Sequence, residues 1–225
     1  MTIGITIPVY VTNSKLKNIL TKTIKSINEL QTKHKIITVG VINRSDYIDI
    51  PGWFDYVVHN RINNVASAWN QGIACATKQG AEVVLVMNQD VFLRHNAIDI
   101  LLKEIEDGNL ITGFADGNEI DYCCFMINPR IIKIVGNFDI SFHPAYFEDN
   151  DYKYRCKLSD IKESIIRTFI YTHARSSTLN HDDKLRKENS TTFEKNRQYY
   201  LRKWGGMPRT EKYRKPWENE ARKKV

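Results

Sequence analysis

The stretch VVLVMNQD, residues 83–90, decides the class of fold. Its first five residues are all apolar, which is typical of a strand buried on both faces of a parallel sheet. Polar residues follow at once and end in the carboxylate of Asp90. Because ligands of open α/β sheets bind beyond the carboxyl ends of the strands, the stretch predicts a polar site at one sheet edge. A single carboxylate there is a usual way to hold a hard cation that also binds substrate phosphates.

Strands and helices alternate on both sides of this stretch. Apolar residues recur at helical spacing in three segments, residues 16–30, 65–76 and 98–105. Runs rich in β-branched residues predict further strands over 3–9, 36–42 and 56–58. The alternation is typical of an α/β protein with a mixed, mainly parallel sheet flanked by helices.

The pattern changes after residue 110. Strands are predicted over 110–114 and 122–127, then a short helix over 130–135 and a last strand over 165–171. We therefore expect antiparallel elements in the second half. From His173 onward neither a helical nor a strand period persists. We interpret residues 1–180 as one domain and residues 181–225 as a C-terminal arm packed on it or near it.

The composition, 42% hydrophobic and 26% charged, is that of an ordinary soluble globular protein. No apolar run approaches the ~20 residues of a membrane span, and no basic stretch precedes the first strand as in a signal peptide. None of the four cysteines forms a CxxC pair. Reduced, mostly buried thiols in a cytoplasmic protein are therefore expected.

The positive charge is concentrated in the arm. Residues 184–225 hold 14 Lys and Arg against 5 Glu, whereas the net charge of the whole chain is only +7. This asymmetry favours a polyanionic partner, such as the phosphates of a ligand, an anionic surface or nucleic acid. A solvated basic tail that aids solubility explains it equally well.

The segment YFEDND, residues 146–151, has three acids in four positions behind two aromatic residues. Acids at the start of a helix complement its dipole. That accounts for one or two of the acids, but not for the aromatic residues that lead into them. The segment is therefore a second candidate for chemistry.

Five motifs in order resemble those of family 2 type glycosyltransferases, which have the GT-A fold, a Rossmann-like arrangement. The match runs from residue 3 to about residue 180 and so implies that residues 1–180 are a GT-A catalytic domain. The tail YYLRKWGG, residues 199–206, also looks like the tails of such enzymes from viruses and phages. The five motifs are IGITIPVY (3–10), NRINNVASAWNQG (60–72), NQD (88–90), GNFD with YFEDND (136–139 and 146–151) and HARSST (173–178).

The resemblance implies a nucleotide-sugar donor linked to UDP, GDP or dTDP. Asn63 would cap the second helix, whose N-terminal N–H groups favour phosphates. Asn70 is equally suited to bonding the loop backbone. The donor contacts implied are Pro8, Tyr10, Asn43, Arg61, Asn63, Asn70 and Asn88.

The same resemblance implies a glycan or glycoconjugate acceptor. Asp149 matches the general base, which takes the proton of the attacking hydroxyl so that the anomeric configuration inverts. Glu148, Asp151 and Tyr146 would bind the acceptor or fix its loop. Phe142 and Phe147 are further candidates for stacking on a sugar, with core packing nearly as good an explanation.

A divalent metal, Mn²⁺ or Mg²⁺, is implied on Asp90, with His173 as a second ligand that suits Mn²⁺ better. Two positions depart from the family pattern. Asn43 stands where an Asp usually holds the base or ribose, and Asn88 replaces the first acid of the metal motif. Metal binding would thus depend on donor phosphates.

The arm suggests a lid hypothesis. Arg202, Lys203 and Arg209 would close over the diphosphate, with Gly205 and Gly206 as a hinge.

Three other functions compete with this interpretation. A sugar-1-phosphate nucleotidyltransferase would carry a Gly-rich loop after the first strand, and residues 8–13 contain no glycine. A nucleic-acid-binding protein is possible from the basic arm, but no motif supports it. A transferase that glycosylates modified phage or viral DNA bases combines the two features.

Overall fold

The computed structural model describes residues 1–45, 52–114, 119–175 and 177–218. Ser176 of the last motif and the end of the arm therefore lie outside the described residues. A seven-stranded sheet forms the centre, in the order β3-β2-β1-β4-β7-β6-β8. Its strands are β1 (Thr2–Val11), β2 (Lys35–Ser45), β3 (Tyr56–His59), β4 (Val83–Met87), β6 (Ile111–Phe114), β7 (Cys124–Ile127) and β8 (Glu163–Ile166).

The first half of the sheet is parallel, as the sequence predicts. β1 pairs in parallel with both β2 and β4, and β2 with β3. β7 then pairs antiparallel with β4 and with β6. β6 pairs with β8 in parallel, so the predicted mixed, mainly parallel α/β sheet with antiparallel elements in its second half is confirmed.

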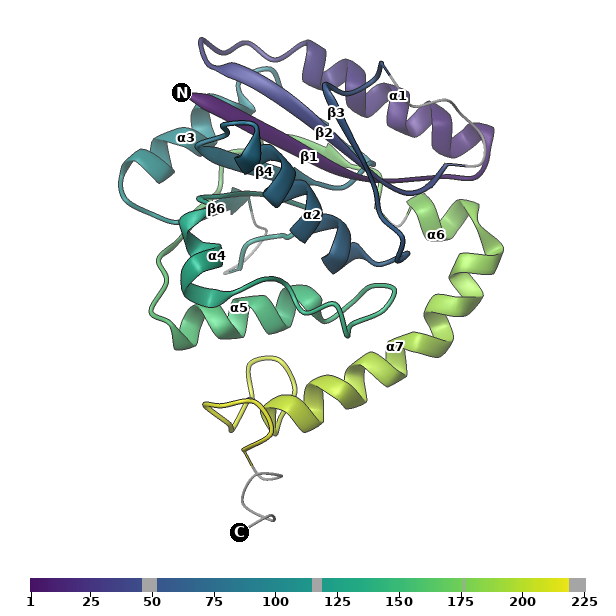
Figure 1. The fold of residues 1–225 in the computed structure, drawn as a ribbon, viewed down its shortest axis with the longest axis vertical. Helices are drawn as coiled ribbons and strands as arrows, with labels where there is room; N and C mark the ends of the chain where they lie inside the picture. Colours follow the sequence, from purple (N-terminus) through teal and green to yellow (C-terminus); the bar gives the residue numbers. More distant parts are fainter. Residues whose placement is uncertain (46–51, 115–118, 176, 219–225) are drawn as a thin grey trace.

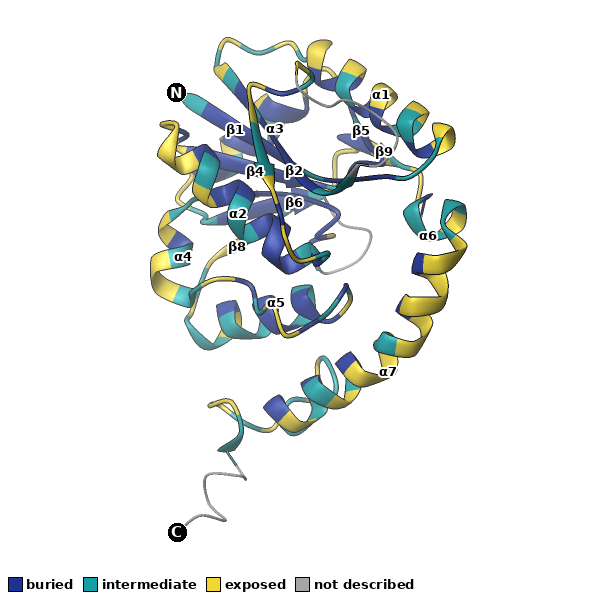
Figure 2. Ribbon diagram, turned by 45° about the vertical axis from the view of Figure 1, so that its right-hand side comes forward, coloured by how far each residue is buried: buried dark blue, intermediate teal, exposed yellow. Residues whose placement is uncertain are grey.

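Helices cover both faces of the sheet (Figure 1). One face packs against α1 and α3, and the other against α2, α4 and α5, so the strands between them are buried (Figure 2). On the second face Gly72 lets α2 approach β1, because a Cβ there would collide with Thr6. These helices are α1 (Ser14–Asn28), α2 (Val65–Lys78), α3 (Ala97–Glu106), α4 (Arg130–Val135) and α5 (Glu148–Leu158).

The prediction of one strand over 165–171 is wrong. β8 ends at Ile166, and the next strand, β9, begins only at Tyr171. β9 (Tyr171–His173) leaves the main sheet and pairs antiparallel with β5 (Val91–Leu93). The apolar run was therefore divided between two sheets.

The arm is helical, contrary to the sequence interpretation. Helices α6 (Ser177–His181) and α7 (Asp183–Trp204) lead from β9 along one side of the body and below α5 (Figure 1). The buried face of α7 includes the polar residues Asn189, Asn196 and Lys203. Apolar residues therefore do not recur at helical spacing along α7, and the sequence gives no periodic signal for this helix. No helix in the described ranges is long and apolar enough to cross a membrane.

Candidate active site

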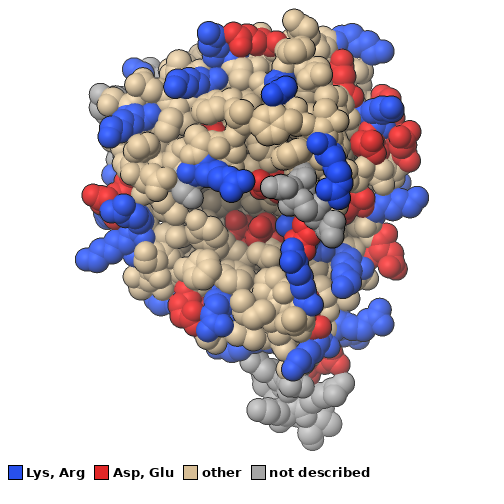
Figure 3. Space-filling model, turned by 180° about the vertical axis from the view of Figure 1, so that it is seen from behind, with Lys and Arg blue, Asp and Glu red and all other residues tan. Residues whose placement is uncertain are grey.

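A pocket of roughly 350 Å³ opens beyond the carboxyl ends of β1, β2 and β4. Seen from behind the view of Figure 1, the molecule is hollowed, with acidic side chains in the depth and Lys and Arg around the rim (Figure 3). The volume lies within the range of small-molecule sites, about 300–1,000 Å³. Most of the residues that the sequence singles out line it: Pro8, Tyr10, Asn43, Asn63, Asn88, Asp90, Tyr146, Glu148, Asp149 and His173.

Gln89 holds the backbone of Tyr10 at one end of the pocket. Its Oε1 accepts from the Tyr10 N–H at 2.8 Å, and its Nε2 donates to the Tyr10 carbonyl at 2.9 Å. The same Nε2 donates to Thr178 Oγ1 at 3.0 Å. The residue between Asn88 and Asp90 thus ties β1 to α6, a role that the sequence analysis missed.

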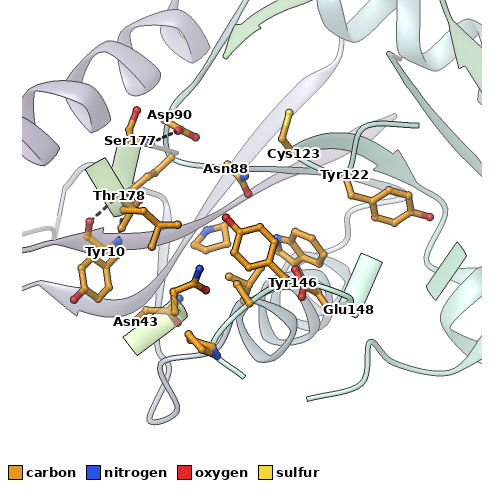
Figure 4. A pocket seen from close by; sticks show the side chains of 18 of the residues that line it. Tyr10, Asn43, Asn88, Asp90, Tyr122, Cys123, Tyr146, Glu148, Ser177 and Thr178 are labelled. Carbon is orange, nitrogen blue, oxygen red and sulfur yellow. Dashed lines mark hydrogen bonds between the residues drawn. The ribbon is translucent and has the colours of Figure 1, made fainter. Parts of the chain in front are cut away.

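Asn43 lies at the same end as Tyr10, whereas Tyr122 and Glu148 lie at the other (Figure 4). Asn60 Nδ2 donates to Asn43 Oδ1 at 2.7 Å. This bond uses one acceptor position of Asn43 Oδ1, and the N–H groups of Asn43 have no partner among the described residues. The substitution for the expected Asp therefore adds a hydrogen-bond donor to the pocket.

Asp90 and His173 meet because β5 begins directly after Asp90 and β9 ends at His173, in antiparallel register. His173 Nε2 lies 3.1 Å from Asp90 Oδ1, and the Ser177 N–H donates to Oδ2 at 3.3 Å. Burial raises the pKa of Asp90, but the contacts with His173 and Ser177 outweigh it, and the net pKa is lowered. The carboxylate is therefore ionised at neutral pH. The sequence analysis predicted these two residues as ligands of one metal only from the family resemblance.

Two further potential ligands lie beside His173. Single ligand atoms of Asp121, Cys123 and His173 all lie within 4.8 Å of one another. Tyr171 Oη donates to Asp121 Oδ2 at 3.1 Å and accepts from Cys123 Sγ at 3.3 Å. The sequence analysis missed Asp121 and Cys123, because they precede β7 and belong to none of the motifs.

The donor set fits a divalent cation. Two ligand atoms that bind one ion at about 2.1 Å and at a right angle lie about 3 Å apart, close to the Asp90–His173 separation. Among the described residues that line the pocket, four are acids and none is Lys or Arg. A cation between these carboxylates and a ligand diphosphate would reduce their repulsion.

Glu148 and Asp149 begin α5 at the other end of the pocket. Burial raises the pKa of both carboxyl groups, and the neighbouring Asp149 raises that of Glu148 further. Asp149 Oδ1 accepts from the Asn150 N–H at 2.8 Å and from Asn150 Nδ2 at 2.9 Å. Its Oδ2 has no hydrogen bond within the described ranges. A carboxylate with a raised pKa and a free oxygen at a pocket wall suits a general base.

The loop that leads into these acids is held by α7. Tyr146 and Phe147 both have positive φ, 78° and 73°, a conformation that costs of order 1–3 kcal/mol in a non-glycine residue. Asn196 Nδ2 donates to the carbonyls of Ala145 at 2.8 Å and His143 at 3.2 Å. These bonds stabilise the strained turn. The sequence motif alone did not predict this role of α7.

Three residues that the sequence offered as ligand contacts lie outside the pocket lining, and for Asp151 and Asn70 the structural alternative applies. Asp151 is fully buried, and its carboxylate binds Arg155, Lys203 and Trp204, so it supports the fold rather than the acceptor. Asn70 binds both the N–H and the carbonyl of Phe138. Arg61 is exposed and lies outside the pocket lining.

The cap of α2 is Asn64 rather than Asn63. Asn64 Oδ1 accepts from the Ser67 N–H at 2.7 Å, while Asn63 lines the pocket. Trp69 is 3% exposed and packs edge-on against Phe138. Phe142 and Phe147 are also buried, which leaves Tyr146 exposed for stacking.

The lid hypothesis is wrong for two of its three cations. Lys203 is buried, with Nζ 2.7 Å from Asp139 Oδ2 and 2.6 Å from Asp151 Oδ1. Arg209 pairs with Glu119 at 2.7 Å. Gly205 is the left-handed cap of α7 with Tyr213 packed on it, so it is no hinge. Arg202 is exposed on α7 and lies outside the pocket lining.

No family model and no curated protein sequence matches the chain. Solved structures do match. S. aureus TarS is 13% identical over 76% of this chain, with a TM-score of 0.58. TarS 1-349 in complex with UDP-GlcNAc matches with a TM-score of 0.57 and in complex with UDP with 0.58, each at 13% identity and 76% coverage of this chain.

These matches show a GT-A-like fold. The chain spans 36% of the length of TarS and 58–60% of the TarS 1-349 chains in the two complexes. TarS comes from a bacterium and lends no support to the viral and phage resemblance of the tail.

Proposed function

We propose that this protein is an inverting glycosyltransferase, which transfers a sugar from a nucleoside-diphosphate sugar to the hydroxyl of a glycan or glycoconjugate. One observation carries the proposal most directly. In a GT-A-like fold, one pocket combines the Asp90–His173 pair with the carboxylate of Asp149. The first is suited to a cation that binds phosphates, and the second to a base.

The donor would lie along the pocket with its base near Tyr10 and Asn43. The N–H groups of Asn43 would donate to a carbonyl oxygen of the base, while Asn60 holds the Asn43 side chain in place through Oδ1. The diphosphate would lie near Asn88 and Asp90, and the sugar toward Glu148. This order follows the positions of the labelled residues in Figure 4.

Asp90 and His173 would hold Mn²⁺ or Mg²⁺, with Asp121 and Asn88 near by. A bound cation acts as a Lewis acid and offsets charge on a leaving diphosphate. The described residues that line the pocket include four carboxylates and neither Lys nor Arg, so a bound cation would offset the negative charge that a diphosphate meets there.

Asp149 would accept the proton of the acceptor hydroxyl. The acceptor oxygen forms a bond to the anomeric carbon while the bond from that carbon to the diphosphate oxygen breaks. The nucleoside diphosphate leaves, and the configuration inverts because attack is direct. The aromatic ring of Tyr146, 38% exposed, would stack on the acceptor.

A panel of UDP-, GDP- and dTDP-sugars with Mn²⁺ tests the proposal, scored by thermal shift and by release of the nucleoside diphosphate. UDP-GlcNAc is the first donor to try, since TarS binds it. We expect at least one donor to raise the melting temperature and to be slowly hydrolysed. The proposal fails if no nucleotide sugar binds, with or without metal.

A further inference from the structure

Helix α7 is hydrogen-bonded to the body of the protein at both ends of the pocket. At its start, Asp182 Oδ2 accepts from Tyr10 Oη at 3.1 Å and from Thr12 Oγ1 at 2.9 Å. Three to four turns later, Asn196 Nδ2 donates to the carbonyl of Ala145 at 2.8 Å. Tyr10 and Ala145 both line the pocket. The helix between these anchors is therefore one wall of the pocket and not a detached arm.

The middle of this wall exposes an unpaired amide to the pocket. Leu185 and Asn189, one turn apart, are 8% and 9% exposed and both line the pocket. The side chain of Asn189 forms no hydrogen bond with any described residue. Asn196, two turns further along the same face, uses its amide fully.

The fold by itself does not favour an asparagine at this position. Asparagine is among the poorer residues of a helix interior, and the amide of Asn189 faces the pocket without a partner among the described residues. A ligand in the pocket would supply the missing partner. An uncharged amide that both donates and accepts matches a hydroxyl group better than it matches a phosphate.

We propose that Asn189 hydrogen-bonds a hydroxyl group of the nucleotide-sugar donor, with Leu185 as the adjoining apolar wall. The inference rests on the proposed function, and it assigns to the arm a part in binding that none of the motifs covers. Ribose and the transferred sugar both carry such hydroxyls, so the ligands of the test must separate them.

The test is calorimetric titration of the full chain with UDP and with UDP-GlcNAc in the presence of Mn²⁺. Asn189→Ala should weaken the affinity about three- to tenfold, the worth of one neutral hydrogen bond. An equal loss for both ligands assigns the contact to the nucleotide, and a loss for UDP-GlcNAc alone assigns it to the sugar. Gln198→Ala, an amide on the exposed side of the same helix, should bind within twofold of wild type.

Asn189→Leu separates binding from folding. If the amide serves a ligand, this variant should melt at or above the wild-type temperature and still bind more weakly. A melting temperature that falls together with the affinity would assign Asn189 a structural role and overturn the inference. Unchanged affinity of both Asn189 variants would overturn it as well. Absence of binding to the wild type would instead overturn the proposed function, and the inference with it.

Discussion

His173 Nε2 lies 3.1 Å from Asp90 Oδ1, although the two residues are 83 positions apart in the chain. The pairing of β5 with β9 brings them together. Their separation is that of two ligands of one cation, and it is also that of a hydrogen bond. Metal titration distinguishes between these two roles.

Asp90→Asn should abolish most of the metal affinity. Loss of a residue that merely orients a ligand already costs 10–100-fold in metal affinity, so loss of the carboxylate should cost at least ~10-fold. The measurement is electron paramagnetic resonance of free Mn²⁺ during titration in the presence of UDP. Asp107→Asn, at the exposed end of α3, is the control. Equal Mn²⁺ affinity in Asp90→Asn and wild type would show that the pair is only a hydrogen bond.

Asp149→Asn should separate binding from transfer. Without a base to accept the hydroxyl proton, the transfer rate should fall about 10²–10⁴-fold, while the affinity for UDP-GlcNAc stays within twofold. Single-turnover transfer and calorimetry measure the two effects. Asp183→Asn, on the exposed first turn of α7, is the matched control. Loss of donor affinity in Asp149→Asn would mean that this carboxylate contacts the donor instead.

As the pH is lowered, the transfer rate should begin to fall at a pH above the pKa of an ordinary aspartate. Burial raises the pKa of Asp149, and a general base works only when deprotonated. Activity is therefore lost as the pH falls through this raised pKa, above the usual value of about 3.9. The check is a pH profile of kcat with saturating donor. A rate that stays constant down to about pH 4 would exclude Asp149 as a base with a raised pKa.

Asn196→Ala should loosen the turn at Tyr146 and Phe147. The substitution leaves the partly buried carbonyls of His143 and Ala145 without their partner. Each such loss costs about 1–3 kcal/mol, and each kcal/mol lowers the melting temperature of a domain of this size by roughly 2–4 °C. Thermal unfolding beside Gln198→Ala measures the effect. Equal melting temperatures in the two variants would contradict a role of α7 in holding the turn.

Lys203→Met should destabilise the protein at neutral pH by roughly 3–5 kcal/mol, because the buried Asp151 and the partly buried Asp139 both lose the buried cation between them. Burial raises the pKa of Asp139, but the bonds from Lys203 and Ser141 together outweigh this and lower the value to about 2. That contribution is complete above the unfolded-state pKa of about 3.9 and is lost as the pH falls toward about 2.

Urea unfolding at several pH values tests the Lys203 prediction. The gap in unfolding free energy between wild type and Lys203→Met should narrow as the pH falls from about 4 to about 2. A difference in unfolding free energy that stays constant over this range would show that Lys203 does not lower the pKa of Asp139. Lys187→Met, at an exposed position of α7, should match wild type throughout.

Local pattern alone was enough for most strands of the main sheet and for the helices that cover it. The apolar run 83–87 became β4 with the predicted bounds, and residues 130–135 became α4. Such elements bury apolar side chains at regular intervals, and the same spacing of apolar residues is visible in the sequence. The same logic predicted a site beyond β4, where Asp90 now lines the pocket.

Tertiary structure alone decided which polar residues face the pocket. Asp149 and Asp151 are two positions apart at the start of α5, yet the first lines the pocket and the second is buried against Lys203 and Trp204. Helix α7 also escaped the sequence analysis, because its inner face is fastened by Asn196 and Lys203. A polar side chain can be solvated by water, form an ion pair or bind a ligand. Only the partners that the fold brings to it determine which of these interactions it makes.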